Sequence, residues 1–125
     1  MNLEKVVFGF FILLAATLNF GFVYGDVDDP ALHNEWELFA ALVVNLITAV
    51  LKFGDRTHIG AVHLASSLVA LLQLAAATVV WVIAAEQGAL APAGIAGVVS
   101  LAAGALLANV VSVVIMVVET TLQRR

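Results

Sequence analysis

The sequence predicts an all-α integral membrane protein in which four transmembrane helices form one bundle, with both termini in the cytoplasm. Three observations lead to this prediction. Hydrophobic residues make up 63% of the 125 residues and charged residues only 11%, whereas soluble domains are about half apolar and a quarter charged. The apolar residues gather into four long runs. All five Lys and Arg residues lie before the first run, between the second and third, or after the fourth.

The first apolar run, residues 6–25, contains no charged residue and has the roughly 20 residues that cross a bilayer core. It predicts a helix over residues 5–24. A cleaved signal peptide is the alternative, because Lys5 precedes the run and Val23-Tyr24-Gly25 is an acceptable cleavage site. The length of the run and the three apolar runs after it favour a retained helix.

The second run is the shortest, with 14 uncharged residues between Glu37 and Lys52. A stretch of this length can also be a re-entrant or interfacial segment. Trp36 can anchor one end at the membrane interface, and the long stem of Lys52 can reach the headgroups at the other. These anchors predict a crossing helix over residues 35–53. The charge pattern agrees, since Lys52 would otherwise share a face with the acidic segment before Glu37.

The third and fourth runs predict helices over residues 58–85 and 92–120. The third run has one ionisable residue, His63, and follows a turn so short that the second and third helices must be antiparallel neighbours. Gly88 and Pro92 interrupt the fourth run, and Pro92 suits a first helical turn. We expect one membrane domain over residues 1–125.

The basic residues determine the expected orientation. Lys and Arg collect on the cytoplasmic side of membrane proteins, so four spans place both termini and the turn after Lys52 in the cytoplasm. The gaps on the other side carry only acidic charges. The basic residues are Lys5, Lys52, Arg56, Arg124 and Arg125.

Small and polar residues along the helices predict how the bundle packs. In lipid, helices associate through close contact of small side chains and through interhelical hydrogen bonds. A ladder of small residues recurs every fourth position of the last helix, at Ala96, Ser100, Gly104, Ala108 and Ser112. Each helix also carries one amide, at Asn19, Asn45, Gln73 and Asn109. We expect these amides to face protein, because an amide in lipid leaves its polar atoms unpaired. They form either a packing network or the lining of a permeation path.

The acidic segment between the first two helices holds the weak candidates for a metal site. Carboxylate oxygens and an imidazole suit a hard divalent cation, but the spacing is not that of a helix-loop-helix calcium site. A solvated acidic loop is the simpler interpretation. The candidate ligands are Asp26, Asp28, Asp29, His33 and Glu35.

Other classes of function lack support in the sequence. There is no cysteine, which excludes disulfides and thiolate metal sites. The net charge of −4 and the absence of a basic stripe argue against nucleic acid as a partner. No nucleotide motif or catalytic constellation is present, so we expect neither enzymatic activity nor a cofactor. His63 is either a proton-sensitive group or, more simply, a hydrogen-bonded core residue.

Two segments resemble an uncharacterised bacterial family of short multi-spanning inner-membrane proteins. They are residues 33–81, HNEWELFAALVVNLITAVLKFGDRTHIGAVHLASSLVALLQLAAATVVW, and residues 101–114, LAAGALLANVVSVV. The resemblance covers nearly the whole chain. It implies a location in the bacterial cytoplasmic (inner) membrane and provides no assigned activity and no catalytic residue.

Two functions remain open at this stage. The first is a structural or accessory membrane protein that packs against itself or a larger membrane partner through the ladder. The second is an oligomeric channel or transporter for small cations or solutes, with the acidic loop at its outer mouth. Either way the lipid bilayer is the immediate partner.

Overall fold

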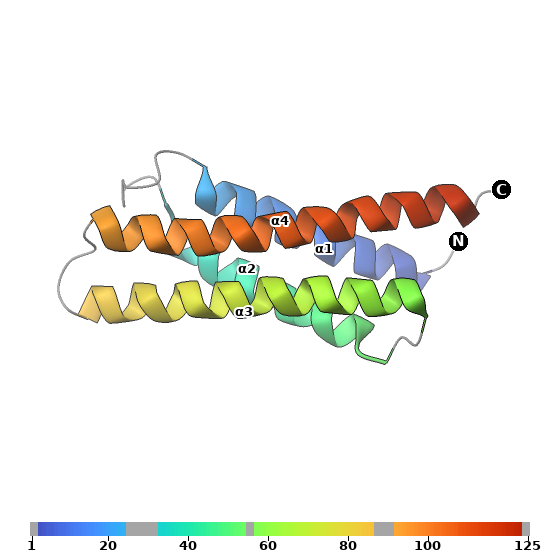
Figure 1. Cartoon of the computed structure of the whole chain (residues 1–125), viewed down its shortest axis with the longest axis horizontal. Coiled ribbons are helices and arrows are strands. Elements are labelled where there is room, and N and C mark those ends of the chain that lie inside the picture. Colours follow the sequence, from blue (N-terminus) through green and yellow to red (C-terminus); the bar gives the residue numbers. More distant parts are fainter. Residues whose placement is uncertain (1–2, 25–32, 55–56, 87–91, 124–125) are drawn as a thin grey trace.

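The described part of the chain consists of four α-helices. The computed structural model describes residues 3–24, 33–54, 57–86 and 92–123, and no strand occurs among them. The helices are α1 (Leu3–Val23), α2 (Glu35–Lys52), α3 (His58–Glu86) and α4 (Pro92–Gln123). Successive helices alternate in direction, so α1 begins at the end of the bundle where α4 finishes (Figure 1). The prediction of an all-helical fold with four helices is confirmed.

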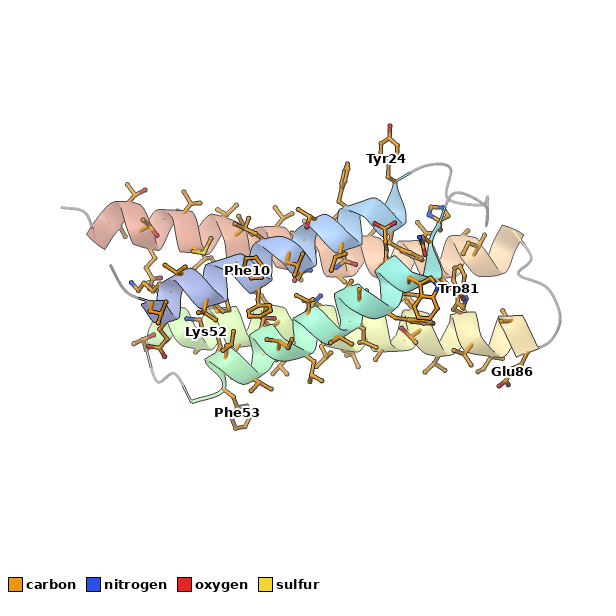
Figure 2. All side chains as sticks on the ribbon, turned by 180° about the vertical axis from the view of Figure 1, so that it is seen from behind. Phe10, Tyr24, Lys52, Phe53, Trp81 and Glu86 are labelled. Carbon is orange, nitrogen blue, oxygen red and sulfur yellow. The ribbon has the colours of Figure 1, made fainter. Side chains whose placement is uncertain are left out.

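Each helix packs against two neighbours in a closed ring. α1 lies between α2 and α4, and α3 lies between the same two helices on the other side. We call the end with the start of α1 and the end of α2 the basic end, because Lys5 and Lys52 lie there. The opposite end is the Trp81 end (Figure 2).

Three of the helices are long and apolar enough to cross a membrane, over Leu3–Val23, His58–Glu86 and Gly94–Leu122. α2 is not among these helices, because its 18 residues include the charged Glu35, Glu37 and Lys52. At 1.5 Å per residue it is about 27 Å long, slightly short of a hydrocarbon core of about 30 Å.

The outer surface of the bundle is rich in large apolar side chains. Phe10, Leu72 and Leu107, on three different helices, are at least 60% exposed. Water would disfavour so much exposed apolar surface, whereas lipid is a suitable solvent for it. The helices are therefore consistent with a multi-pass membrane protein.

Side chains from just outside the helices satisfy the first backbone N–H groups of α2 and α3. The Asn34 carboxamide accepts from the Trp36 N–H at 2.9 Å. The Thr57 hydroxyl accepts from the Gly60 N–H, also at 2.9 Å. Such N-caps fix where a helix begins.

Buried positions alternate in steps of three and four along the helices. On α1 they include Phe8, Ile12, Ala15, Asn19 and Phe22. On α3 they are Gly60, His63, Ser67, Ala70, Leu74, Ala77 and Trp81. This 3-4 spacing is typical of nearly antiparallel helices that pack with a left-handed twist.

The interior has two chemically different halves. Toward the Trp81 end, an apolar cluster from all four helices fills it: Phe22, Leu38, Ala41, Ala70, Leu74, Ala77, Trp81, Ile95, Val98, Val99, Ala102 and Ala105. Most of the buried polar side chains lie in the middle of the bundle or toward the basic end: Asn45, Thr48, His63, Ser67, Asn109 and Ser112. Asn19 is an exception, because it lies near the end of α1 at the Trp81 end. The buried residues of α2, α3 and α4 therefore change from polar to apolar toward the Trp81 end, whereas those of α1 are mostly apolar throughout.

Candidate functional site

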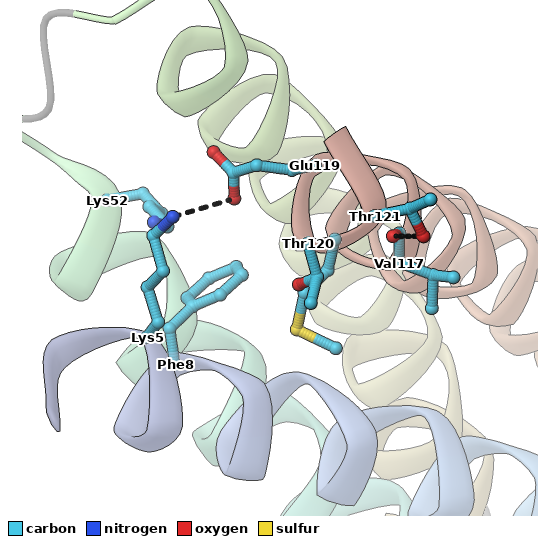
Figure 3. Close-up of a pocket in the computed structure, with 8 residues that line it drawn as sticks. Lys5, Phe8, Lys52, Val117, Glu119, Thr120 and Thr121 are labelled. Carbon is cyan, nitrogen blue, oxygen red and sulfur yellow. Dashed lines mark hydrogen bonds and ion pairs between the residues drawn. The ribbon is translucent and has the colours of Figure 1, made fainter. Parts of the chain in front are cut away.

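A pocket opens at the basic end between α1, α2 and α4. Its volume is about 340 Å³, and its lining includes charged side chains from all three helices as well as the apolar Phe8 and Met116. Figure 3 shows Lys5 and Lys52 both pointing toward Glu119 at the mouth of this pocket. The fold thus brings together charged residues that are far apart in sequence.

The lysines of the pocket contact a carboxylate and an aromatic ring. Nζ of Lys5 lies 3.9 Å from Oε1 of Glu119, and the two side chains are 39% and 18% exposed. Nζ of Lys52 lies 4.3 Å from the centre of the buried Phe8 ring, a distance at which an ammonium group is attracted to an aromatic face. Among the described lining residues, the charged ones are these two lysines and Glu119.

A series of polar side chains continues from the pocket into the bundle. The ring of His63 on α3 packs edge-to-face with the ring of Phe8, which lines the pocket, at 4.8 Å between ring centres. Farther in, the Thr48 hydroxyl lies 3.2 Å from the Ser67 hydroxyl and joins α2 to α3. The Asn45 amide donates to the carbonyl of Ala41 at 2.8 Å. The Asn45 bond lies within α2, so the Thr48–Ser67 bond is the one of the two that holds α2 and α3 in register.

Three of these interior side chains lack hydrogen-bond partners among the described residues. Both polar atoms of Asn19 and of Asn109, and the hydroxyl oxygen of Ser112, are buried and unpaired there. Each of the three side chains is at most 1% exposed. Unpaired buried polar atoms are uncommon and mark sites of strain, hydration or ligand binding.

The packing register places Asn109 far from the pocket mouth. α1 and α4 are aligned by the contact of Lys5 with Glu119 and by Gly9, where an added Cβ would lie 3.1 Å from Sδ of Met116. Ten residues separate Glu119 from Asn109 on α4, a helical rise of about 15 Å. Asn109 therefore lies about halfway along the bundle.

A second concave feature is a groove on the outer face between α3 and α4. Its volume is about 440 Å³, and its lining is mostly apolar and small: Val62, Ala65, Ser66, Val69, Gln73, Gly104, Leu107, Ala108 and Val111. The Gln73 amide lies over Gly104, where an added Cβ would be 2.9 Å from Nε2. Gly104 therefore permits this amide to fold against α4.

The five residues of the small-residue ladder do not share one environment. Ser112 is buried, Ser100 is exposed, and Ala96, Gly104 and Ala108 are half-buried. Four residues advance the helix by about 400°, so a four-residue spacing drifts about 40° around the helix at each step. Gly104 and Ala108 line the groove.

The four amides are also placed differently. Asn19, Asn45 and Asn109 are inside the bundle, whereas Gln73 is half-buried at the groove, although its Oε1 atom is buried and unpaired among the described residues.

Three of the candidate metal ligands, Asp26, Asp28 and Asp29, lie outside the described residues. Nδ1 of the buried His33 is hydrogen-bonded to the Phe22 carbonyl, which accepts only, so Nδ1 carries the hydrogen. Glu35 accepts from Nε1 of Trp81 at 3.2 Å. Across residues 3–24, 33–54, 57–86 and 92–123, no three His, Asp or Glu side chains are grouped to hold a metal ion.

Sequence reasoning missed the pocket and the Thr48–Ser67 hydrogen bond. The sequence pattern placed Lys5, Lys52 and Glu119 at the same side of the membrane but could not show that they converge. Positions 48 and 67 carry hydroxyls within apolar runs, which was the available signal for a polar contact.

Comparisons with known proteins identify a family without an assigned activity. A search of curated proteins and a search of solved structures both found no match. A family model described as a family of unknown function, DUF6394, matches residues 32–120. The match includes α2 and α3 and most of α4, with the pocket residues Lys52 and Glu119. The chain, matched over well more than half its length, belongs to the DUF6394 family.

Proposed function

We propose that this chain is a structural or accessory protein of the bacterial inner membrane that crosses the bilayer four times and associates with a second copy of itself. The groove between α3 and α4 is the observation that carries the proposal. The role is one of protein interaction and involves no catalysis. Both termini are in the cytoplasm.

The position of α2 supports four spans. Glu35 at its start is hydrogen-bonded to Trp81 of α3, and Lys52 at its end lies over Phe8 of α1. α2 therefore runs alongside α1 and α3, which supports a crossing of the bilayer together with these neighbours. Its short length is compensated by Lys52, whose stem can extend to the headgroups.

The positions of the basic residues support the orientation. Lys5 and Lys52 lie at one end of the bundle. Arg56 follows α2 closely in sequence, and Arg124 and Arg125 follow α4. Positive charge concentrates on the cytoplasmic side, so the basic end faces the cytoplasm.

The α3–α4 face has both parts that helix packing needs, a groove and a ridge. Small residues such as Gly104 and Ala108 line the groove. α4 exposes a row of branched side chains at Leu107, Val111, Val114 and Val118, and the first two of these also line the groove. Helices pack when such a ridge enters a groove on the partner. In a two-fold dimer the row of each copy occupies the groove of the other.

Association in a neutral detergent tests the interface, with analytical ultracentrifugation as the measurement. Gly104→Leu fills the groove and should weaken dimerisation at least about tenfold, the effect of losing roughly 1.4 kcal/mol. The matched control is Gly97→Leu, because nothing lies within 4 Å of an added Cβ there. Ala108→Leu is a second groove variant. Equal association of all four proteins would exclude this face.

Cysteine labelling tests the orientation. The chain has no cysteine, so each introduced thiol is unique. We expect position 56 to react only with reagent on the cytoplasmic side, and positions 28 and 88 only from outside. Labelling of position 56 from outside would contradict the four-span arrangement.

A cation or solute pathway is the second candidate, favoured by the unpaired atoms of Asn19, Asn109 and Ser112 inside a single bundle. Flux into proteoliposomes tests it, with Asp28→Asn and Asp29→Asn as variants of the acidic loop. Flux no greater than in empty liposomes would exclude a pathway, and flux that these variants leave unchanged would exclude a role for the loop.

A further inference from the structure

We propose that Gln73 of each copy is hydrogen-bonded to Ser100 of the other copy, so that a second chain completes the groove between α3 and α4. The inference rests on the proposed function, because it requires a dimer in which both copies have the same orientation across the bilayer. This polar contact would determine the depth at which the two copies meet.

The polar side chains in the middle of α3 divide into two groups. Ser67 lies 3.2 Å from the Thr48 hydroxyl of α2, and Thr78 donates to a carbonyl of its own helix at 2.8 Å. Ser66 and Gln73 make no hydrogen bond among the described residues, and both line the groove. The groove is therefore the part of α3 where polar groups call for a partner from outside the chain.

The Gln73 amide lies at a depth where lipid cannot satisfy it. The amide is folded against α4 at Gly104, which buries Oε1, whereas Nε2 stays at the surface of the groove. Gln73 is near the middle of the 29-residue helix α3, which the proposed arrangement places in the centre of the bilayer. Lipid chains offer no acceptor there, so an unpaired N–H group is costly. A protein acceptor in the groove would remove that cost.

Ser100 of α4 provides such an acceptor on the second copy. It is exposed and makes no hydrogen bond among the described residues. It precedes Leu107 by seven residues, so it continues the exposed row of α4 that enters the partner's groove. Copies with the same orientation are related by a two-fold axis along the bilayer normal, which places identical residues at equal depth. Ser100 is four residues from Gly104, a helical rise of about 6 Å, and a hydrogen bond of about 3 Å with a turn of the Gln73 side chain covers this distance.

The two groups are complementary in charge. The Nε2–H groups of Gln73 donate, and Oγ of Ser100 in the second copy accepts. The two-fold axis repeats the contact, so each dimer contains two of these bonds. Apart from Ser66, the other residues that line the groove are apolar or glycine. One polar contact within an apolar seam fixes the register of packed helices, so the Gln73–Ser100 pair selects one dimer among the packings that small residues permit.

A double-mutant cycle of dimerisation tests the bond, with analytical ultracentrifugation of the full chain in neutral detergent as the measurement. Gln73→Leu and Ser100→Ala should each weaken dimerisation about eightfold, because each dimer loses two interhelical hydrogen bonds. The double variant should be no weaker than either single variant. Ser66→Ala is the matched control, since it removes a hydroxyl of the same groove about 10 Å from Gln73 along α3. It should dimerise like the wild type.

Disulfide crosslinking in reconstituted bilayers tests which residues meet. The chain has no cysteine, so Gln73→Cys and Ser100→Cys each introduce a unique thiol. When the two variants are mixed and oxidised, with a tag on one of them, we expect a crosslinked pair that contains both. Leu72→Cys is the control, because its side chain is 72% exposed beside Gln73 but outside the groove lining, and it should not crosslink to Ser100→Cys. Circular dichroism of each variant checks that the helices remain folded.

The outcomes separate this bond from the dimer itself. Wild-type dimerisation of Gln73→Leu or Ser100→Ala, additive losses in the double variant, or the absence of a crosslink between positions 73 and 100 would overturn the bond. If one of these results occurs while Gly104→Leu still weakens dimerisation, the proposed function stands without it. A wild-type chain that stays monomeric in detergent and in bilayers would reject both.

Discussion

Replacement of Asn109 by leucine tests whether a buried amide without a hydrogen-bond partner among the described residues lowers the stability of the folded bundle. Asn109 is 1% exposed, and neither polar atom of its amide has a partner among the described residues. Two unsatisfied buried groups cost at least about 2 kcal/mol together. Leucine has the same branch point but is larger, and the extra volume in a packed interior costs about 1 kcal/mol. Asn109→Leu should therefore stabilise the protein by about 1 kcal/mol.

Unfolding in mixed micelles with increasing dodecyl sulfate, followed by circular dichroism, measures this change. A gain of 1 kcal/mol lowers the unfolding equilibrium constant roughly fivefold. Val110→Leu is the control, because Val110 is the exposed neighbour on the same helix, and it should change the stability by less than about 0.5 kcal/mol. A loss of more than about 1 kcal/mol for Asn109→Leu would refute the reasoning. It would mean that the amide is hydrogen-bonded in the folded protein, to water or a solute in the interior, and would favour the pathway.

Three further predictions concern individual contacts. Thr48→Val and Ser67→Ala should show a coupling of about 0.6 to 1.7 kcal/mol in a double-mutant cycle of unfolding, since their hydroxyls are bonded across α2 and α3; strictly additive effects would argue against the bond. Gly104→Ala should gain about 1 kcal/mol of helix propensity in a Gln73→Ala background and less in the wild type, where the Gln73 amide occupies the space; equal gains in both would contradict that contact. Asn34→Ala should cost about 0.5 to 2 kcal/mol by removing the cap of α2, whereas Asn34→Asp should retain the stability; equal losses would show that the cap is dispensable.

The four helices could be predicted because uncharged runs and breaking residues are local signals, but the face of each helix could be predicted only where polar residues mark it. On α2, polar Asn45 and Thr48 stand among apolar neighbours, and both are buried in the structure. On α3, the Gln73 amide is half-buried at the groove, whereas the buried line passes through Ser67 and Leu74. Lipid and protein interior are both apolar, so hydrophobicity along α3 does not distinguish the two sides.

The pocket could not be predicted because it depends on the register of three helices. Lys5 and Glu119 are separated by more than a hundred residues in the sequence and meet where Gly9 of α1 packs closely against Met116 of α4. A shift by one helical turn would separate the two charges by about 5 Å. No sequence pattern specifies such a register, since small residues permit several close approaches.

The interior packs differently toward the two ends of the bundle, and this difference determines which end opens more easily. At the Trp81 end, large side chains interlock, and the indole of Trp81 is tied to α2 through Glu35. Toward the basic end, polar contacts replace part of this apolar packing, among them the Thr48–Ser67 hydrogen bond and the Lys5–Glu119 ion pair. Thermal motion will therefore separate the helices at the basic end first, while the Trp81 end stays packed. Amide hydrogen exchange should accordingly be faster near Lys5 and Glu119 than around Leu74 and Val98, with the rates falling gradually along each helix.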